Sequence, residues 1–453
     1  MAEVPATMES QELSQLSPLE WIMPRSYVSQ ILCFPSSNPR IAQVLLDGLA
    51  GTLRDVPYLA SRVVSRDHPK GSVALSLPRD SLSDLFRVNS LLTTVDYNTL
   101  KSGGFKPSLF DGLILSSPNI NPANTSPSPV FRAVLSLVNG GCLLWVSMHH
   151  STADITAFGS LLKIWASYCR TGSSEDIQFD PSWLDRSAIV RQSHDVPADT
   201  PLLLHKEESS NSASQPSKPQ NLETHFFRYS AQYLKGLKVE VNKHLPEGTT
   251  WVSTSDILTA IIWGSIVHSE DAVANDNVAD ETCLMRIAVN CRSRFNPPLP
   301  KNYLGAAFGV TLVNAKRADL IAIGTATEQT LSLPAIANVA ASVRQSVNFM
   351  DGDKMKAIVK HLTSQQDVTN LKLCQEPAPR VAVVSWADQG VYELDWGAEL
   401  GHCEAVRLPS FKAKRYPVVF PRLPNGDLEV LVSFDTETVK KWKAAYDMSP
   451  WKA

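Results

Sequence analysis

The chain has 453 residues, of which 43% are hydrophobic and 19% charged, so it has enough material for two or three globular domains. Its net charge of −3 argues against nucleic acid as a partner, and no apolar run reaches the roughly 18–20 residues of a membrane helix. Seven scattered cysteines lack a Cys-x-x-Cys pair, and the polar N-terminus lacks a signal-peptide pattern. These features predict a cytoplasmic protein with reduced thiols and no membrane anchor.

The first half, residues 1–203, mixes predicted strands and helices. Apolar runs predict strands at 27–34, 72–77, 130–138 and 142–148. Helical spacing of apolar residues predicts a helix from Ile41 that ends before Pro57, and another from about Ile155 to Cys169.

A polar cluster follows the apolar strand at 142–148. It reads His149-His150-Ser-Thr-Ala-Asp154. A histidine at a strand end can face a cleft and take a proton from an alcohol or amine, which predicts His150 as a general base. The alternative is that Asp154 only caps a helix and His150 is a buried, satisfied side chain. A metal site is disfavoured, because neighbouring strand residues point to opposite faces, so His149 is expected to be packed.

Residues 204–221 are rich in Ser, Pro and charge and predict a polar linker. The second half, residues 222–453, predicts strands at 223–229, 285–289, 381–386, 418–420 and 428–434 and helices at 254–268 and 436–446. Strands and helices mix without strict alternation, which predicts two α/β or α+β layered domains. Ser253-Thr-Ser-Asp-Ile257 echoes Ser151-Thr-Ala-Asp-Ile155, and each predicts a helix start.

The cluster from His149 to Asp154 resembles the His-His-x-x-x-Asp motif of the BAHD acyltransferases, especially their microbial trichothecene-acetyltransferase-like branch. Ile155 stands where the family usually has glycine. Further resemblances follow in the family's order along nearly the whole chain. They are Leu16-Ser-Pro-Leu-Glu-Trp21, Ser253 to Trp263, Asn290-Cys-Arg292, Asn302-Tyr-Leu-Gly305, Ser385-Trp386 and a shortened signature, Asp395-Trp396-Gly397.

The resemblance implies two similar layered domains of the CoA-dependent, chloramphenicol-acetyltransferase-like type with a channel between them. It implies no bound cofactor or metal. Acyl-CoA, with acetyl-CoA expected, serves as co-substrate, and a hydroxylated secondary metabolite serves as acceptor of a monomeric enzyme. His150 would be the base, and the indole N–H of Trp386 would stabilise the oxyanion.

The remaining motif residues receive structural roles from the resemblance. Asp154 would pair with an arginine, and either Arg292 or Arg294 could instead pair with Asp395. The Asp395-Trp396-Gly397 element would shape the channel wall, with a core position as the alternative for Trp396. CoA could meet Ser253 and Thr254 at a helix N-terminus, where simple capping is the alternative.

Three other functions remain open from the sequence. The same base could deprotonate an amine, which would make an amide. A carrier-protein thioester could replace acyl-CoA, as in condensation domains. A relative that only binds a small molecule would not need the base at His150.

Overall fold

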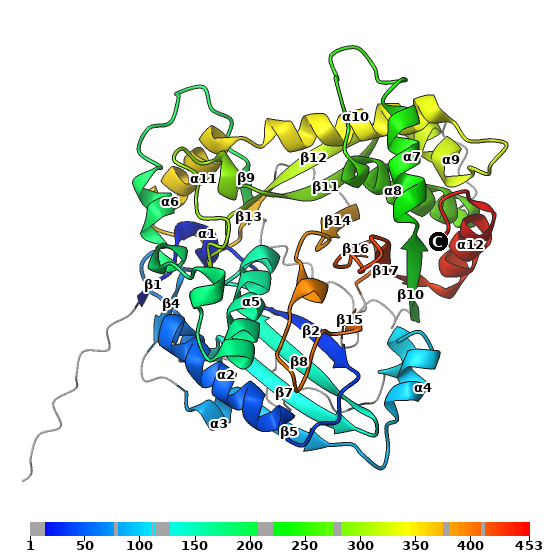
Figure 1. Cartoon of the computed structure of the whole chain (residues 1–453). Coiled ribbons are helices and arrows are strands. Elements are labelled where there is room, and N and C mark those ends of the chain that lie inside the picture. Colours follow the sequence, from blue (N-terminus) through cyan, green and yellow to red (C-terminus); the bar gives the residue numbers. More distant parts are fainter. Residues whose placement is uncertain are drawn as a thin grey trace, which may run out of the picture.

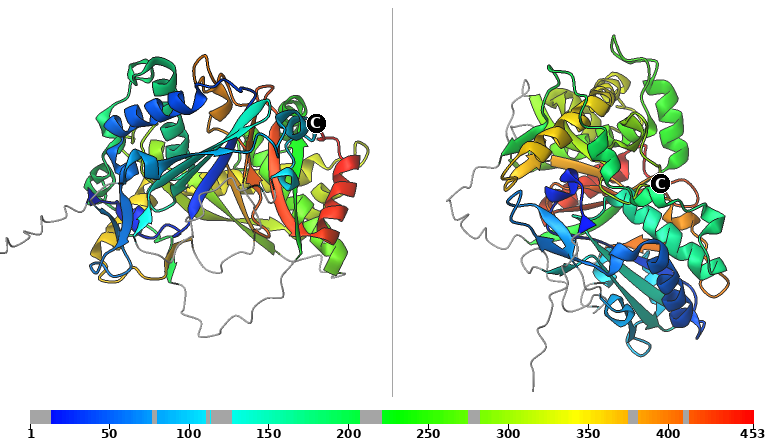
Figure 2. Two further views of the ribbon diagram at one scale, coloured as in Figure 1. Left: turned by 90° about the horizontal axis from the view of Figure 1, so that it is seen from below. Right: turned by 90° about the vertical axis from the view of Figure 1, so that its left-hand side faces the viewer.

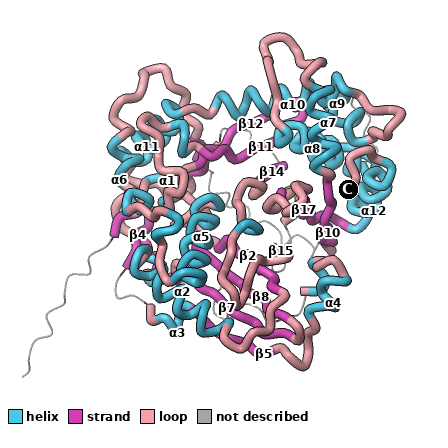
Figure 3. Tube along the Cα trace, in the orientation of Figure 1, coloured by secondary structure: helices cyan, strands magenta, loops and turns pink. Residues whose placement is uncertain are grey.

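The structure is a computed structural model that describes residues 14–76, 80–110, 113, 127–206, 221–274, 282–374, 381–408 and 413–453. Helices surround two large open sheets, which lie in the lower and upper parts of Figure 1 and are magenta in Figure 3. This arrangement confirms the mixed α/β fold class expected from the sequence.

The first sheet has five strands in the order β15-β2-β8-β7-β5. Their bounds are β15 (Ala405–Arg407), β2 (Tyr27–Phe34), β8 (Gly141–His149), β7 (Phe131–Val138) and β5 (Phe86–Ser90). All nine residues of β8 are buried, because both faces of this central strand are covered. Leu144 joins the main core with helices α2 (Ile41–Asp55) and α5 (Ile155–Thr171), while Leu143 joins a smaller core on the other face.

The second sheet has six strands in the order β10-β17-β16-β14-β11-β12. Their bounds are β10 (Leu222–Tyr229), β17 (Leu428–Asp435), β16 (Val418–Val419), β14 (Val381–Ser385), β11 (Thr282–Asn290) and β12 (Phe308–Lys316). Helix α8 (Thr254–Ala274) packs against four others, which are α7 (Ala231–Val241), α9 (Arg317–Gly324), α10 (Leu333–Phe349) and α12 (Thr436–Met448). In Figure 1 these helices lie along the top and right of the molecule.

Shorter elements complete the described fold. A small sheet joins β1 (Ser14–Gln15), β4 (Val73–Ser76), β3 (Arg62–Ser65) and β6 (Ser128–Pro129). The remaining α-helices are α1 (Pro18–Trp21), α3 (Leu82–Leu85), α4 (Tyr97–Ser102), α6 (Ser187–Arg191) and α11 (Gly352–Ser364). Single 3-10 turns occupy Pro57–Ala60, Pro107–Leu109, Glu175–Ile177, Pro181–Leu184, Arg292–Arg294 and Val391–Glu393.

The right-hand view of Figure 2 shows most of the second half above most of the first. Strand pairing nevertheless joins the two halves at two places. Strand β15 of the second half pairs antiparallel with β2, placing Ala405 opposite Cys33. Strand β9 (Leu204–Lys206), at the start of the expected linker, pairs with β13 (Leu371–Leu373). Within the expected linker, Leu204–Lys206 are therefore ordered by backbone pairing, and residues 207–220 lie outside the described residues.

Candidate active site

Strand β8 ends at His149, opposite Tyr27 of β2. The buried imidazole packs edge-on against the Tyr27 ring, with centroids 5.1 Å apart, and its Nδ1 accepts a hydrogen bond from the Ser151 backbone N–H at 3.2 Å. Burial, followed by the positive charge of Arg25, lowers the pKa of His149 to about 4. The structure thus places His149 inside the protein as a neutral, packed side chain.

His150 is the first residue after β8, and its backbone N–H donates to the Ser26 carbonyl at 2.8 Å. Its half-buried ring lies 6.3 Å, between centroids, from the Phe308 ring at the start of β12. The imidazole therefore lies where the two halves of the chain meet. Burial lowers the pKa of His150, while nearby backbone oxygens and the Asp154 carboxylate act in the opposite direction. The net effect favours the neutral imidazole, which is the form that accepts a proton.

Asp154 is buried, with 5% of its surface exposed. Its carboxylate accepts the Ala157 backbone N–H at 2.9 Å, which caps helix α5, and the Ala307 backbone N–H at 2.9 Å from the second half. Two hydrogen bonds of 2.8 Å come from the Arg292 guanidinium. Although burial opposes ionisation, Arg292 and the backbone donors hold the pKa of Asp154 below its usual range. The carboxylate therefore fixes the loop that carries His150.

Arg292 joins Asp154 to the second half of the chain. Besides the carboxylate, its guanidinium donates to the carbonyls of Tyr303, at 3.0 Å, and Gly305, at 2.8 Å. The sequence left open whether Arg292 or Arg294 pairs with Asp154, and the partner is Arg292. Arg294 instead donates to the carbonyls of Val347 and Met350.

The Asp395-Trp396-Gly397 element lies at the far end of helix α5, next to Arg170. Asp395 accepts the Gly397 backbone N–H at 3.0 Å and lies 3.9 Å from the Arg170 guanidinium. Gly397 has φ +92°, and a Cβ there would come within 3.2 Å of the Cys169 carbonyl oxygen. Glycine is favoured at this position, because its φ is positive and a side chain would press against the backbone of α5.

Trp396 occupies the core position that was the alternative to a channel wall. Its indole is fully buried in the core, edge-on to Phe34 and Trp165, with centroids 5.8 and 5.5 Å apart. A large apolar side chain gains more from such burial than from a solvated channel, and the core alternative therefore holds.

Trp386 follows strand β14 and is half-buried. Its ring is tilted against Phe420, with centroids 5.4 Å apart, and its backbone N–H donates to the Val419 carbonyl. None of the described residues accepts a hydrogen bond from its indole nitrogen, which leaves this donor available. Three residues on, the Gln389 amide exchanges hydrogen bonds of 2.7 and 3.2 Å with Gln30 of β2, which ties this segment to the first sheet.

Ser253 caps helix α8, as the alternative interpretation had it. Its hydroxyl accepts the Asp256 backbone N–H at 3.2 Å and also bonds the Asp256 carboxylate, which in turn binds Arg344. Thr254 begins the helix and is half-buried. Ser253, Asp256 and Arg344 thus form hydrogen bonds with one another. A CoA contact at Ser253 and Thr254 stays a prediction.

Two half-buried arginines near the His150 loop were not identified from the sequence. Arg25 donates to the Ser151 hydroxyl at 2.7 Å, and Arg186 donates to the Thr152 carbonyl at 3.2 Å while it pairs with fully buried Glu20. Their sequence neighbourhoods carry no spacing that links them to residues 126 and 34 positions away. Only the fold brings them together.

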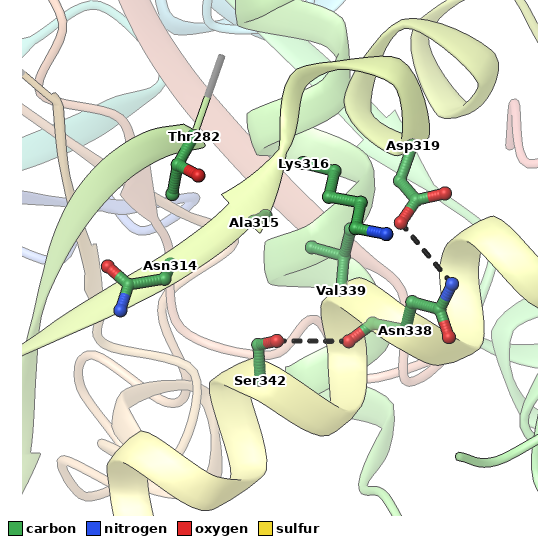
Figure 4. A pocket seen from close by; sticks show the side chains of 8 residues that line it. All are labelled: Thr282, Asn314, Ala315, Lys316, Asp319, Asn338, Val339 and Ser342. Atoms are coloured by element: carbon green, nitrogen blue, oxygen red, sulfur yellow. Dashed lines mark hydrogen bonds between the residues drawn. The ribbon is translucent and has the colours of Figure 1, made fainter. Parts of the chain in front are cut away.

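A polar pocket of about 360 Å³ lies between β12 and α10, lined by Lys316, Asp319 and Asn338 among others (Figure 4). A second hollow of about 370 Å³ continues along α10 and shares Asn314 with it. Asn314 is six residues along β12 from Phe308, which corresponds to about 20 Å of strand. The first pocket, whose β12 lining begins at Asn314, is therefore separate from the surroundings of His150.

Two further observations concern the described residues alone. None of their helices combines the length and apolarity that crossing a bilayer requires. Their His, Cys, Asp and Glu side chains also form no group of three that could hold a metal ion.

Comparisons with known proteins define the class. Residues 4–448 match the model of the transferase family, so the chain belongs to this family, whose motifs were recognised above as those of BAHD acyltransferases, and it is an acyltransferase. It is 23% identical to acyltransferase BOA11 of Botryotinia fuckeliana, over 97% of each chain. It is 25% identical to trichothecene 3-O-acetyltransferase TRI101 of Fusarium sporotrichioides, over 90% of this chain and 89% of the relative.

The fold is likewise shared with solved structures. The crystal structure of F. sporotrichioides TRI101 complexed with coenzyme A and T-2 superimposes with a TM-score of 0.80 at 22% identity. The match covers 97% of this chain and 99% of that one. The first and second halves described above therefore have the arrangement found in that enzyme.

Proposed function

We propose that the chain transfers an acyl group, with acetyl expected, from acyl-CoA to a hydroxyl of a secondary metabolite, with His150 as general base. One observation carries this proposal. A neutral imidazole lies where the two halves meet, on a loop whose far end is fixed by the Asp154–Arg292 pair. TRI101, whose fold this chain shares, was solved with coenzyme A and a toxin bound, which supports a CoA thioester and a hydroxylated acceptor as the two substrates.

The chemistry needs a single base in a complex that holds both substrates. The His150 imidazole takes the proton from the acceptor hydroxyl as that oxygen bonds to the thioester carbonyl carbon. The tetrahedral intermediate then collapses, the C–S bond breaks, and the departing thiolate takes the proton from the imidazolium. The products are an ester and free CoA, and the enzyme returns to its starting state.

The negative charge on the tetrahedral oxygen needs a donor. We assign this role to the indole N–H of Trp386, because the residue is half-buried and none of the described residues accepts a hydrogen bond from this N–H. Ser253 and Thr254, at the N-terminus of α8, are the proposed contacts for the CoA pantetheine or phosphates.

The setting of the enzyme forms part of the same proposal. A cytoplasmic monomer without nucleic-acid or membrane partners fits the near-neutral net charge of −3. It also fits a reaction that requires only two small substrates. The domains would divide at 204–221, with the substrate channel between them.

The decisive experiment measures free thiol released from acetyl-CoA with pooled hydroxylated and amino metabolites as acceptors. Wild type is compared with His150→Ala, and His225→Ala is the control, because His225 is another half-buried histidine with a pKa lowered to about 4. We expect acceptor-dependent release that falls by about 10²–10⁴ in His150→Ala alone. Equal release by wild type and His150→Ala would contradict the role of His150, and an acylated amine among the products would show an N-acyltransferase.

A further inference from the structure

Arg25 differs from the other two arginines that hold the His150 loop. Arg186 and Arg292 each pair with a buried carboxylate, Glu20 and Asp154. Arg25 has no carboxylate partner among the described residues, and its terminal nitrogens bind one hydroxyl and three backbone carbonyls. Without a counter-charge, the guanidinium of Arg25 acts through its planar set of N–H donors, which fixes the directions of its hydrogen bonds.

The acceptors of Arg25 come from three separate segments. Nη1 donates to the Ser151 hydroxyl at 2.7 Å and to the Met23 carbonyl at 3.3 Å. Nη2 donates to the carbonyls of Trp21, at 2.6 Å, and Gly71, at 2.9 Å. The guanidinium therefore fixes the Ser151 hydroxyl, one residue from His150, to two neighbouring loops.

The Gly71 contact extends this connection to the second half of the chain. Gly71 has φ +81° and packs so closely on Thr369 that a Cβ would lie 2.5 Å from the Thr369 hydroxyl. Beside it, the Val368 backbone N–H donates to the Lys70 carbonyl at 2.8 Å. The Arg25 fork thus links the catalytic loop to both halves, through residues other than those that Arg292 contacts.

We propose that Arg25 is a positioning residue for the acyl transfer proposed above, which acts through the Ser151 hydroxyl to hold the His150 imidazole in its reactive orientation. The Asp154–Arg292 pair fixes the far end of the loop, four residues after His150. The Arg25–Ser151 bond fixes the near end. A displacement of about 1 Å at a proton-transferring group can cost about 10²-fold in rate, so a clamp beside the base matters for turnover.

The test uses Arg25→Gln, Ser151→Ala and the double variant, with Arg294→Gln as control. Arg294 also binds backbone carbonyls, those of Val347 and Met350, but lies in the second half. We expect kcat to fall by about 10–100-fold in Arg25→Gln and Ser151→Ala, while the KM for acetyl-CoA stays within about twofold. The double variant should fall no further than either single one, because both changes remove the same hydrogen bond.

A second readout does not depend on turnover. Histidine-labelled protein gives NMR signals of the His150 ring, which His150→Ala assigns. We expect these signals to shift in Arg25→Gln and Ser151→Ala and to stay in place in Arg294→Gln. Arg25→Lys, which keeps the charge and loses the fork, should resemble Arg25→Gln.

The outcomes separate this inference from the proposed function. Additive falls in kcat, or unchanged His150 signals in both single variants, overturn the role of Arg25. If wild type releases no thiol with any acyl-CoA, the proposed function fails, and the NMR comparison alone decides whether Arg25 positions the ring. If Arg25→Gln does not fold, Ser151→Ala, which removes only the accepting oxygen, decides the same question.

Discussion

Asp154 and Arg292 are joined by two hydrogen bonds of 2.8 Å although 138 residues separate them in the chain. The pair links the first turn of α5 to the segment that precedes β12. It therefore fixes the His150 loop and the contact between the halves at the same point. Because these contacts are structural, we propose that the carboxylate positions the loop and takes no part in proton transfer.

Replacing Asp154 with alanine should destabilise the fold strongly. Arg292, 3% exposed, would keep its charge without a counter-ion, and we expect the free energy of unfolding to fall by about 3–5 kcal/mol. Urea denaturation measures this loss. Asp435→Ala is the control, because Asp435 caps α12 in a more exposed position and should cost about 1 kcal/mol. Equal losses in the two variants would contradict the buried pair.

The same carboxylate should make stability depend on acidic pH. Its pKa is lower in the folded protein than the ordinary value of about 3.9, so the folded state binds fewer protons here than the unfolded state. The stabilisation is complete above that ordinary value and is lost as pH falls toward the lowered pKa. Urea midpoints measured from neutral to acidic pH should therefore decline less steeply in Asp154→Asn than in wild type.

The rate of acyl transfer should retain its full value at mildly acidic pH. Burial lowers the pKa of His150 from an ordinary value of about 6.5, and the base acts only when it is unprotonated. We expect kcat/KM to be constant near neutrality and to fall as pH drops through this lowered pKa. A pH profile of thiol release tests this, and a midpoint above 6.5 would show that burial does not control the base.

Trp386→Phe removes the indole N–H and retains an aromatic ring against Phe420. If this N–H binds the oxyanion, kcat should fall by about 10²–10³, while the KM for acyl-CoA changes little. Steady-state kinetics test it. Trp263→Phe, a change in the buried face of α8, controls for the loss of an indole. Normal turnover by Trp386→Phe would assign the donor elsewhere.

Trp396→Ala separates a core position from a channel position. Loss of an indole packed between Phe34 and Trp165 should lower the free energy of unfolding by about 3–5 kcal/mol. The KM values of the protein that remains folded should not change. A lowered affinity for either substrate without a loss of stability would restore the channel interpretation.

Local pattern predicted the fold class and the central elements well. The apolar run at 142–148 became strand β8, and the helical spacing from Ile155 became α5 with Asp154 as its cap. These features depend on neighbours in the sequence. Helix α10 and edge strand β12 were missed. Most buried side chains of α10 are alanines, and the buried positions of β12 include Gly309 and Thr311, so apolar residues mark the buried face of either element weakly.

The long-range relationships of the site could not be predicted in the same way. Two arginines, Arg292 and Arg294, lie two residues apart on one 3-10 turn, and only the fold shows which one faces Asp154. Arg25 lies in an apolar stretch far from Ser151, with no spacing that relates the two. The resemblance implied a channel-wall role for the motif around Trp396, but the indole of Trp396 is buried in the core.

The pairing of β15 with β2 has a consequence for dissecting the protein. A fragment of residues 1–203 would lack β15, and the backbone of Ile31–Cys33 would become an open sheet edge. Such edges pair with other chains, so this fragment should aggregate, whereas co-expression with residues 222–453 should restore a soluble complex. Solubility regained on co-expression would show that the first half needs β15 of the second half to fold.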